Sequence, residues 1–221
     1  MANRIIGLKN IHLAPMTSEG VYEKPVAVVG AKSLKIKNNF TDAQFYSDDV
    51  MDYASNILSS LEIEMELAYL LPELEAKITG KTFDAETGVM VSKASDRSNR
   101  FALLFEMTTL EKPIRKVIYD VTLNKDETNS QTQEDKVEEQ LVKLTGVAKP
   151  GKGGAFDLVL DANQKITNGV GVMALSLDSK AKERRSITDV TQTKNWQKFF
   201  DGPFLPDQPF SPSVDEYFTI K

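Results

Sequence analysis

Residues 61–67 are Leu61-Glu62-Ile63-Glu64-Met65-Glu66-Leu67, an unbroken alternation of apolar and acidic side chains. Successive side chains of a β-strand point to opposite faces, so this period of two predicts a strand with its apolar face in a core. The opposite face carries three glutamates, which repel one another along the strand. A solvent-facing side of an antiparallel sheet is one explanation. A surface that must not bind a polyanion is the other.

The segment after this strand predicts a short helix from Pro72 to Ile78. Proline fits the first turn, Glu73 and Glu75 fit its positive end, and Gly80 fits the C-terminal cap. The remaining regular elements predicted from the pattern are mostly strands, with one aromatic helical turn near the C-terminus. They are Pro25–Gly30, Ser33–Lys37, Val89–Val91, Arg100–Thr109, Pro113–Leu123, Glu138–Ala148, Phe156–Leu160, Val170–Leu177 and the turn Thr193–Phe200 with Trp196, Phe199 and Phe200.

Three segments lack a clear period. We expect Asn38–Ser60 to be a long loop with a short strand near Ala43–Tyr46, and the polar Asn124–Lys136 to be a mobile loop. Residues 202–221 hold four prolines among aromatic side chains, which predicts an extended arm. The chain is thus expected to be mainly β. One domain over residues 1–201 with a C-terminal extension over 202–221 is the simplest organisation, and two small domains are the alternative.

Composition excludes several kinds of chemistry. The chain has no cysteine and one histidine, so disulfides, thiolate catalysis and multi-histidine metal sites are excluded. Its net charge of −5 does not favour nucleic-acid binding, which needs clustered lysine and arginine. No apolar run resembles a signal peptide or a membrane span. We therefore expect a protein made in the cytoplasm.

A search for catalytic motifs yields none. His12 lies in an apolar segment and is interpreted as a packed or surface histidine. Residues Gly151-Lys152-Gly153-Gly154 lack the spacing of a phosphate-binding loop and predict a turn. The acid pairs Asp48-Asp49 and Glu138-Glu139 lack the alternating oxygen ligands of a calcium loop. We expect no catalytic, metal or cofactor site, and no enzyme activity.

The order of motifs resembles the major tail (tail tube) proteins of siphophages that infect Gram-positive bacteria. The similarity extends from residue 1 to about Pro206, and residues 170–190 do not match. The motifs are Gly7-Leu8-Lys9-Asn10-Ile11-His12, Gly30-Ala31-Lys32-Ser33-Leu34, Phe45-Tyr46-Ser47-Asp48-Asp49, Leu61-Glu62-Ile63-Glu64-Met65 with Leu71-Pro72, Phe101-Ala102-Leu103-Leu104-Phe105-Glu106 and Asn195-Trp196 with Leu205-Pro206.

This resemblance implies an antiparallel β-sandwich or barrel flanked by one short helix, with long loops and a C-terminal arm. It also implies hexameric rings that stack around a tape measure protein into a tube through which DNA passes without specific binding. Tail terminator and distal tail proteins would be further partners, and the virion tail the location. The residues implied are Glu62, Glu64 and Glu66 in the lumen, Phe45, Tyr46, Asp48, Asp49 and Tyr53 in an inter-subunit loop, and Phe204, Phe210, Tyr217 and Phe218 as anchors of the arm.

Other functions remain open on the sequence. A tube protein of a contractile tail or of a phage-like bacteriocin would have similar features. A monomeric carbohydrate-binding or adhesion β-sandwich would need exposed aromatic platforms, whereas Trp196 lies in an apolar setting. An enzyme that uses paired carboxylates is a third alternative.

Overall fold

A computed structural model describes residues 3–47, 50–125, 127, 139–163 and 194–203, with the backbone alone described for residues 43–47, 50–54 and 194–195. The elements are β1 (Ile5–Ser18), β2 (Val21–Tyr22), β3 (Val26–Ala27), β4 (Ala31–Ser47), β5 (Val50–Leu67), α1 (Pro72–Thr79), β6 (Thr82–Asp84), β7 (Val89–Val91), β8 (Arg100–Thr109), β9 (Ile114–Lys125), β10 (Val142–Ala148), β11 (Asp157–Asp161) and α2 (Lys194–Gln197), with 3-10 turns at Lys152–Gly154 and Phe199–Asp201.

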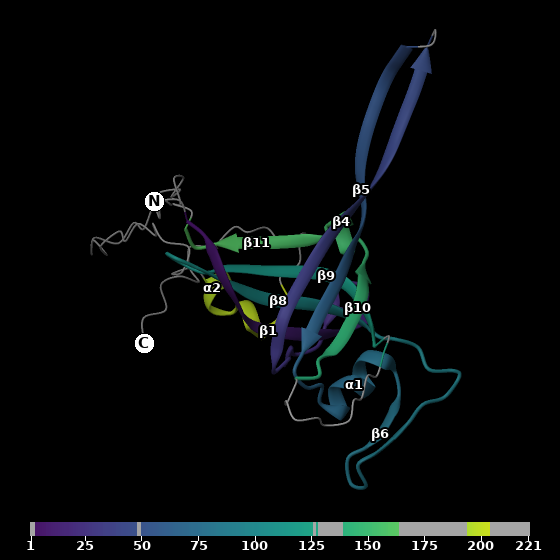
Figure 1. The fold of residues 1–221 in the computed structure, drawn as a ribbon, viewed down its shortest axis with the longest axis vertical. Helices are drawn as coiled ribbons and strands as arrows, with labels where there is room; N and C mark the ends of the chain where they lie inside the picture. The colour runs from purple at the N-terminus through teal and green to yellow at the C-terminus, as the bar shows by residue number, and fades with distance from the viewer. Residues whose placement is uncertain (1–2, 48–49, 126, 128–138, 164–193, 204–221) are drawn as a thin grey trace, which may run out of the picture.

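Most strands belong to one antiparallel sheet in the order β2-β1-β8-β9-β10-β5-β4, and a small β6-β7 hairpin stands apart from it. The sheet curls, so that β4, β5 and β10 cross in front of β1, β8 and β9 (Figure 1). Two further strands extend it, β3 along β1 and β11 along β9. The predicted mainly β fold with one flanking helix is therefore confirmed.

The main core lies between the two crossing layers. Leu61, Ile63, Met65 and Leu67 of β5 are all at most 2% exposed and pack in one cluster with residues of β8, β9 and β10. The strand predicted from the period of two is thus confirmed, including which of its faces is buried.

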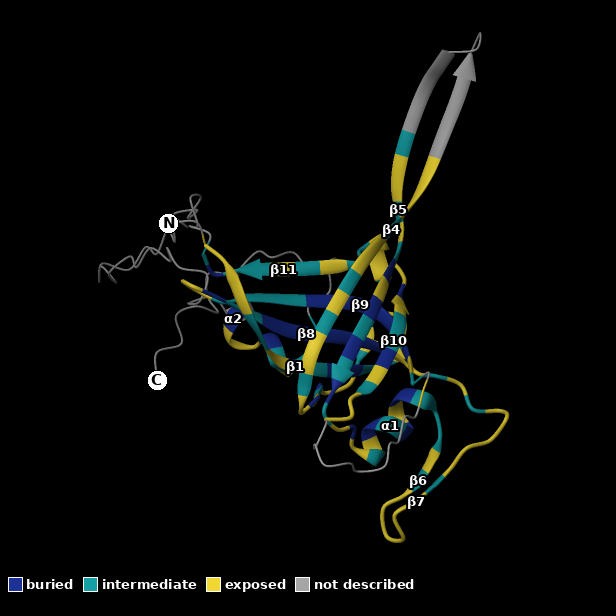
Figure 2. Cartoon of the chain, in the orientation of Figure 1, coloured by how far each residue is buried: buried dark blue, intermediate teal, exposed yellow. Residues whose placement is uncertain are grey.

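Strand β8 is buried on both faces. Residues Phe101 to Phe105 are each at most 2% exposed, and the strand is dark blue along most of its length in Figure 2. Phe101, Leu103 and Phe105 enter the main core, whereas Ala102 and Leu104 enter a second cluster on the other side of the sheet. A continuous apolar run is typical of a strand covered on both sides. The second cover is the segment 194–201, where the predicted helical turn is confirmed.

The prediction of a loop over Asn38–Ser60 is wrong. These residues form most of a long hairpin in which β4 and β5 pair from Ala31↔Leu67 to Ser47↔Val50. The register shifts between Asn39 and Phe40 and between Phe45 and Tyr46. Each shift reverses the alternation of side chains, so the sequence period is lost although the backbone ladder continues. The distal half of the hairpin projects away from the body (Figure 1).

Strand β9 changes its neighbour at Asp120. Residues 114–118 pair with β11 and residues 121–125 pair with β10, both on the same side of β9. Asp120 has φ of 49°, and its buried carboxylate accepts hydrogen bonds from Arg100. One strand is thereby shared between two neighbours.

Helix α1 covers one end of the curled sheet (Figure 1). It extends one residue beyond the prediction, to Thr79, and Gly80 caps it with φ of 74° and an N–H that donates to the Ala76 carbonyl. Leu74 and Ile78 join the main core. Glu75 accepts hydrogen bonds from Lys81 at 3.1 Å and Lys125 at 3.0 Å, which ties the helix to the end of β9.

Other predicted segments have mixed outcomes. The strand expected over Glu138–Ala148 begins at Val142, and Asn124 and Lys125 belong to β9 rather than to a loop. The strand Val170–Leu177 and the arm beyond Pro203 lie outside the described residues. In the described part of the chain, no helix has the length and apolar character needed to cross a membrane.

We predict that Gly146→Ala destabilises the fold by about 2 kcal/mol. Gly146 of β10 lies between β9 and β5, and an added Cβ would be 2.4 Å from the Thr122 carbonyl oxygen. Gly7→Ala is the matched control, because its Cβ would meet only ordinary contacts with Thr108 at 3.6 Å or more. Urea denaturation of both variants measures the difference, and equal midpoints would contradict the close approach.

We also predict that Glu75→Gln lowers the free energy of unfolding by about 1–2 kcal/mol at neutral pH. Burial alone raises the pKa of Glu75, but hydrogen bonds from Lys125 and Lys81 outweigh it and hold the pKa below its ordinary value. A lowered pKa stabilises the fold above the unfolded pKa of about 4.3, and this contribution is lost as the pH falls through the folded pKa.

The difference between wild type and Glu75→Gln should therefore shrink as the pH is lowered below about 4.3. Glu73→Gln is the control, since Glu73 is in the same helical turn and does not join the ion pairs of Glu75 with Lys81 and Lys125. Urea denaturation across this pH range tests the prediction, and a difference that does not vary with pH would refute it.

Candidate functional site: an outward sheet face beside an open strand edge

Glu62, Glu64 and Glu66 all point outward from β5, as the sequence predicts. Strand β5 is flanked by β4 on one side and β10 on the other, so the three glutamates lie in the middle row of a three-stranded face. The side chains of Glu62 and Glu64 are 47% and 45% exposed. This outward face of β4, β5 and β10 is called the charged face below.

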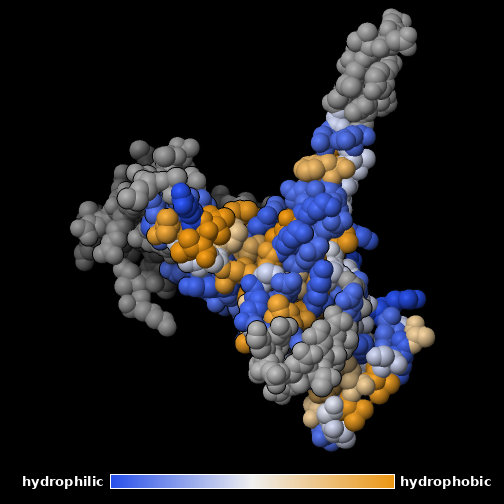
Figure 3. All heavy atoms as spheres, in the orientation of Figure 1, coloured by the Kyte–Doolittle hydropathy of each residue, from blue (hydrophilic) through white to orange (hydrophobic). Residues whose placement is uncertain are grey.

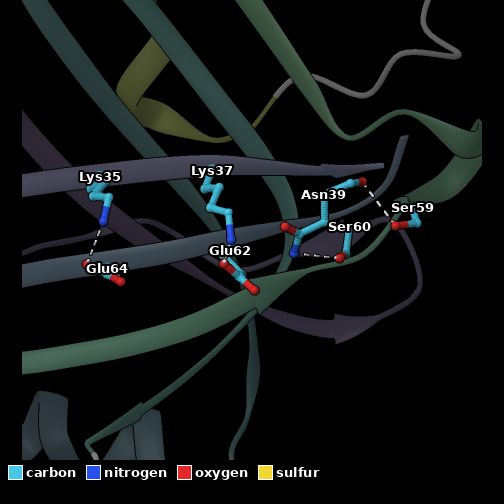
Figure 4. Close-up of polar contacts among 7 residues, drawn as sticks. All are labelled: Lys35, Lys37, Asn39, Ser59, Ser60, Glu62 and Glu64. Atoms are coloured by element: carbon cyan, nitrogen blue, oxygen red, sulfur yellow. Dashed lines mark hydrogen bonds and ion pairs between the residues drawn. The ribbon is translucent and has the colours of Figure 1, made fainter. Parts of the chain in front are cut away.

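Each glutamate has a partner on β4. Lys37 lies across from Glu62 with Nζ 3.1 Å from Oε2, and Lys35 lies across from Glu64 at 3.4 Å (Figure 4). Ser33 Oγ donates to Glu66 Oε2 at 2.7 Å. The repulsion expected along this row of glutamates is therefore offset, because the neighbouring strand places lysines in register with two of them.

Strand β10 completes the charged face with the outward residues Lys143, Thr145 and Val147, which pair in register with Glu66, Glu64 and Glu62. The face thus carries three glutamates and three lysines, Lys35, Lys37 and Lys143, and its charges balance. The alternation of Lys35 and Lys37 was visible in the sequence. Which strand lies beside residues 61–67, and in what register, was not.

Within this face, hydrogen bonds favour the ionised form of the Glu62 carboxylate. Hydrogen bonds from Asn39 and from Lys37 lower the pKa of Glu62. Asn39 is itself held by Ser60 and Ser59, so its amide is positioned beside the carboxylate (Figure 4). Glu62 therefore remains ionised and paired in mildly acidic as well as neutral solution.

The charged face ends at an open strand edge. In the described part of the chain, β4 pairs with β5 alone, and its other edge has no neighbouring strand. An edge of this length presents a row of backbone N–H and C=O groups that can pair with another chain. Strand β4 carries Lys32, Lys35 and Lys37. Charged side chains on an edge strand, lysine above all, limit its unspecific pairing with other chains.

The hairpin extends this open edge away from the body. Phe40 and Ile57, at its base, are 54% and 60% exposed, and Figure 2 shows a mixture of exposed and half-buried residues where the hairpin leaves the body. The backbone register places Phe45 opposite Tyr53, and Tyr46 opposite Met51, in the distal part. Asp48 and Asp49 lie outside the described residues. Phe45, Tyr46 and Tyr53, three of the residues predicted to contact a neighbour, are therefore in the strands of a projecting hairpin rather than in a surface loop.

A second exposed apolar group lies where β1 begins. Ile5, Ile6 and Leu110 are each more than half exposed, and the Leu110 N–H donates to the Arg4 carbonyl. Figure 3 shows apolar residues gathered at this end of the molecule. The sequence prediction did not include these residues, because three isolated apolar positions carry no periodic signal.

The other predicted residues are placed as follows. The His12 ring packs against Phe200 with centroids 4.8 Å apart, and its Nδ1 lies 2.9 Å from the Asn10 carbonyl, which confirms a packed histidine. Glu139 pairs with Lys32 at 3.1 Å, whereas Glu138 lies outside the described residues. Phe204, Phe210, Tyr217 and Phe218 also lie outside them. Among the described side chains, no group of three or more acidic or histidine residues is arranged to hold a metal ion.

In comparisons with known proteins, no protein-family model and no curated protein matches this chain. The case for a function therefore depends on the geometry described above and on the motif resemblance.

We predict that E62K/E64K/E66K makes the protein bind DNA. The substitution changes the charged face from three glutamates and three lysines to six lysines. Six lysines would neutralise DNA phosphates and release the counterions bound to the DNA. Fluorescence anisotropy with labelled duplex DNA should show binding that weakens steeply with salt, and none for the wild type.

The control is the charge-swapped variant K35E/K37E/E62K/E64K, which retains opposite charges at both cross-strand pairs. It should bind DNA no better than the wild type. Binding by both variants would show that individual lysines, and not the balance of the face, determine DNA contact.

Proposed function

We propose that this chain is a tail tube protein of a long-tailed phage, which assembles into stacked rings around a DNA conduit. The open edge of β4 and the projecting hairpin support this proposal most directly. Both are features that a monomer leaves without a partner, whereas an assembly uses them. The resemblance of the motif order to siphophage major tail proteins supplies the same function independently.

Ring formation follows from the nature of the edge. When a strand edge pairs with a different surface on the next copy, the contact is heterologous, and such contacts close into a ring if the rotation permits. The family resemblance implies six copies. Strand β4 of each copy would extend the sheet of its neighbour, so that the charged faces join into one continuous lining.

A balanced charged face suits a conduit for DNA. A lining rich in unpaired lysine would hold phosphates, and a lining of unpaired carboxylates would repel them at the cost of repulsion within the ring. Paired glutamates and lysines avoid both, since Lys35 and Lys37 each have a carboxylate partner. We therefore retain Glu62, Glu64 and Glu66 as proposed lumen residues and add Lys35, Lys37 and Lys143.

The proposal includes the partners and location that the resemblance implies. A tape measure protein would occupy the lumen during assembly, tail terminator and distal tail proteins would contact the tube ends, and the mature location would be the virion tail. A tube protein of a contractile tail or of a phage-like bacteriocin would use the same open edge and hairpin, and remains the second candidate.

A monomeric carbohydrate-binding sandwich is less well supported. Such a protein needs an aromatic ring exposed as a platform for a sugar, but Trp196 is 7% exposed and lies beneath the Arg115 guanidinium. The exposed aromatics Phe40 and Tyr69 are separated, with one at the base of the hairpin and the other beyond the opposite end of β5.

The test is negative-stain electron microscopy of the concentrated protein beside a variant with a shortened hairpin. Residues 42–56 are replaced by Asn-Gly, which allows a two-residue turn to close directly on the Thr41↔Ile57 pair. We expect the wild type to form rings or tubes, and the shortened variant to remain in single particles or isolated rings.

Folding of the shortened variant is checked by circular dichroism and by the fluorescence of Trp196, the only tryptophan, which is buried in the body. Discrete single particles of wild-type protein at high concentration would refute the proposed function. Normal tubes from a folded shortened variant would refute the role of the hairpin alone.

A further inference from the structure

The outer face of β1, β8 and β9 is covered by a short helical segment from the C-terminal region. This segment, residues 194–201, consists of α2 and the following 3-10 turn and is called the aromatic segment. Trp196 is 7% exposed and Phe199 is fully buried. Phe199 packs with Ala14, Ala102, Leu104, Val117 and Tyr119, which form its docking surface together with Arg115 and Glu106.

Side chains hold the aromatic segment in place. The Arg115 guanidinium lies 4.1 Å from the centre of the Trp196 ring and 5.0 Å from that of Phe200, and it donates to the Trp196 carbonyl. Arg115 Nε is in turn held by Glu106 at 2.8 Å. Because the segment is helical, no β-ladder ties it to the sheet. It is a compact segment that is held by side-chain contacts and by the hydrogen bond from Arg115.

The chain between the sheet and the aromatic segment is much longer than docking within one copy requires. Leu160 of β11 pairs directly with Arg115, and Asn163, three residues later, is hydrogen-bonded to Lys112. Asn163 is therefore only three residues, about 10 Å of extended chain, beyond the residue that pairs with Arg115 of the docking surface. A connection of a few residues spans a distance of this order. Residues 164–193 connect Asn163 to Lys194, and a chain of about 30 residues reaches about 100 Å when extended.

We propose that the aromatic segment is an exchangeable connector, which in the assembled state docks on the same surface of a second copy of this chain. Docking on the neighbour restores every interaction that the segment makes on its own copy, and the long connection carries little additional loop entropy. The partner is a copy of the chain and the recognised group is an aromatic-rich helical turn received by Arg115. The inference uses the proposed function in one respect, since assembly supplies the high local concentration of neighbours.

Concentration decides which copy provides the segment. A connection of about 30 residues keeps the segment at an effective concentration of about 1 mM near its own docking surface. A free monomer in dilute solution therefore uses its own segment. Neighbours fixed in an assembly reach the same concentration, and the docked segment then joins one subunit to the next.

Cysteine bridging tests the proposal on a background without native cysteine. His12 and Phe200 are in contact across the docking surface, with ring centroids 4.8 Å apart. Two single variants, His12→Cys with an affinity tag and Phe200→Cys without one, are mixed in denaturant, refolded together, concentrated and treated with a short bismaleimide. Docking between copies should give a bridged heterodimer, on the order of 100-fold above random collision.

The collision control pairs His12→Cys with Lys93→Cys, an exposed residue that follows the β6-β7 hairpin. The double variant H12C/F200C carries both cysteines in one chain and therefore reports docking within one copy. Such docking yields a bridged monomer and no bridged dimer. Trp196 fluorescence confirms that the segment is docked in each variant.

Electron microscopy of the same samples separates this inference from the proposed function. If rings or tubes form but the mixed single variants give no heterodimer and H12C/F200C gives only bridged monomer, the exchange is overturned and the tube function stands. Heterodimers without rings or tubes would support the exchange and overturn the tube function. Bridged monomer in a sample of single particles would overturn both.

Discussion

Strand β8 must be covered on both of its faces, and most of the architecture follows from this requirement. Its inner side chains meet the layer of β4, β5 and β10, and its outer side chains meet the aromatic segment. Five consecutive apolar residues cannot be buried by one layer. The chain therefore covers one side of β8 with β4, β5 and β10, and it covers the other side with the aromatic segment, residues 194–201.

This division leaves the two sides of the sheet with different surfaces. The side covered by the aromatic segment is sealed by Arg115, which places its charge over aromatic rings and against Glu106. The outer side of β4, β5 and β10 is instead open, with its charges paired across strands. The hairpin and the β4 edge project from this open side. A subunit built in this way has one closed surface and one surface suited to contact with other molecules.

Sequence patterns predicted the elements that depend on local signals. The period of two identified residues 61–67 of β5 and their buried face, and the proline, acidic and glycine positions identified α1. The hairpin was missed because β5 has an extra residue at Ser59 and another at Asp52, and each shifts the register and interrupts the alternation on which the prediction depends. The paired state of Glu62 and Glu64 was missed because it depends on strand register, which is a tertiary property. The outer cover of β8 was implied by the run Phe101–Phe105, but that run does not specify which distant segment supplies the cover.

The sharing of β9 between two neighbours has a mechanical consequence. The Tyr119 N–H bonds to the β11 side, at the Phe156 carbonyl, whereas the adjacent Asp120 carbonyl accepts from Lys149 beside β10. A pull transmitted from the hairpin through β5 and β10 thus reaches a strand that contains Arg115, whose side chain holds the aromatic segment. Tension would travel along the backbone of β9, and the Arg100–Asp120 ion pair holds the residue at which its neighbour changes from β10 to β11.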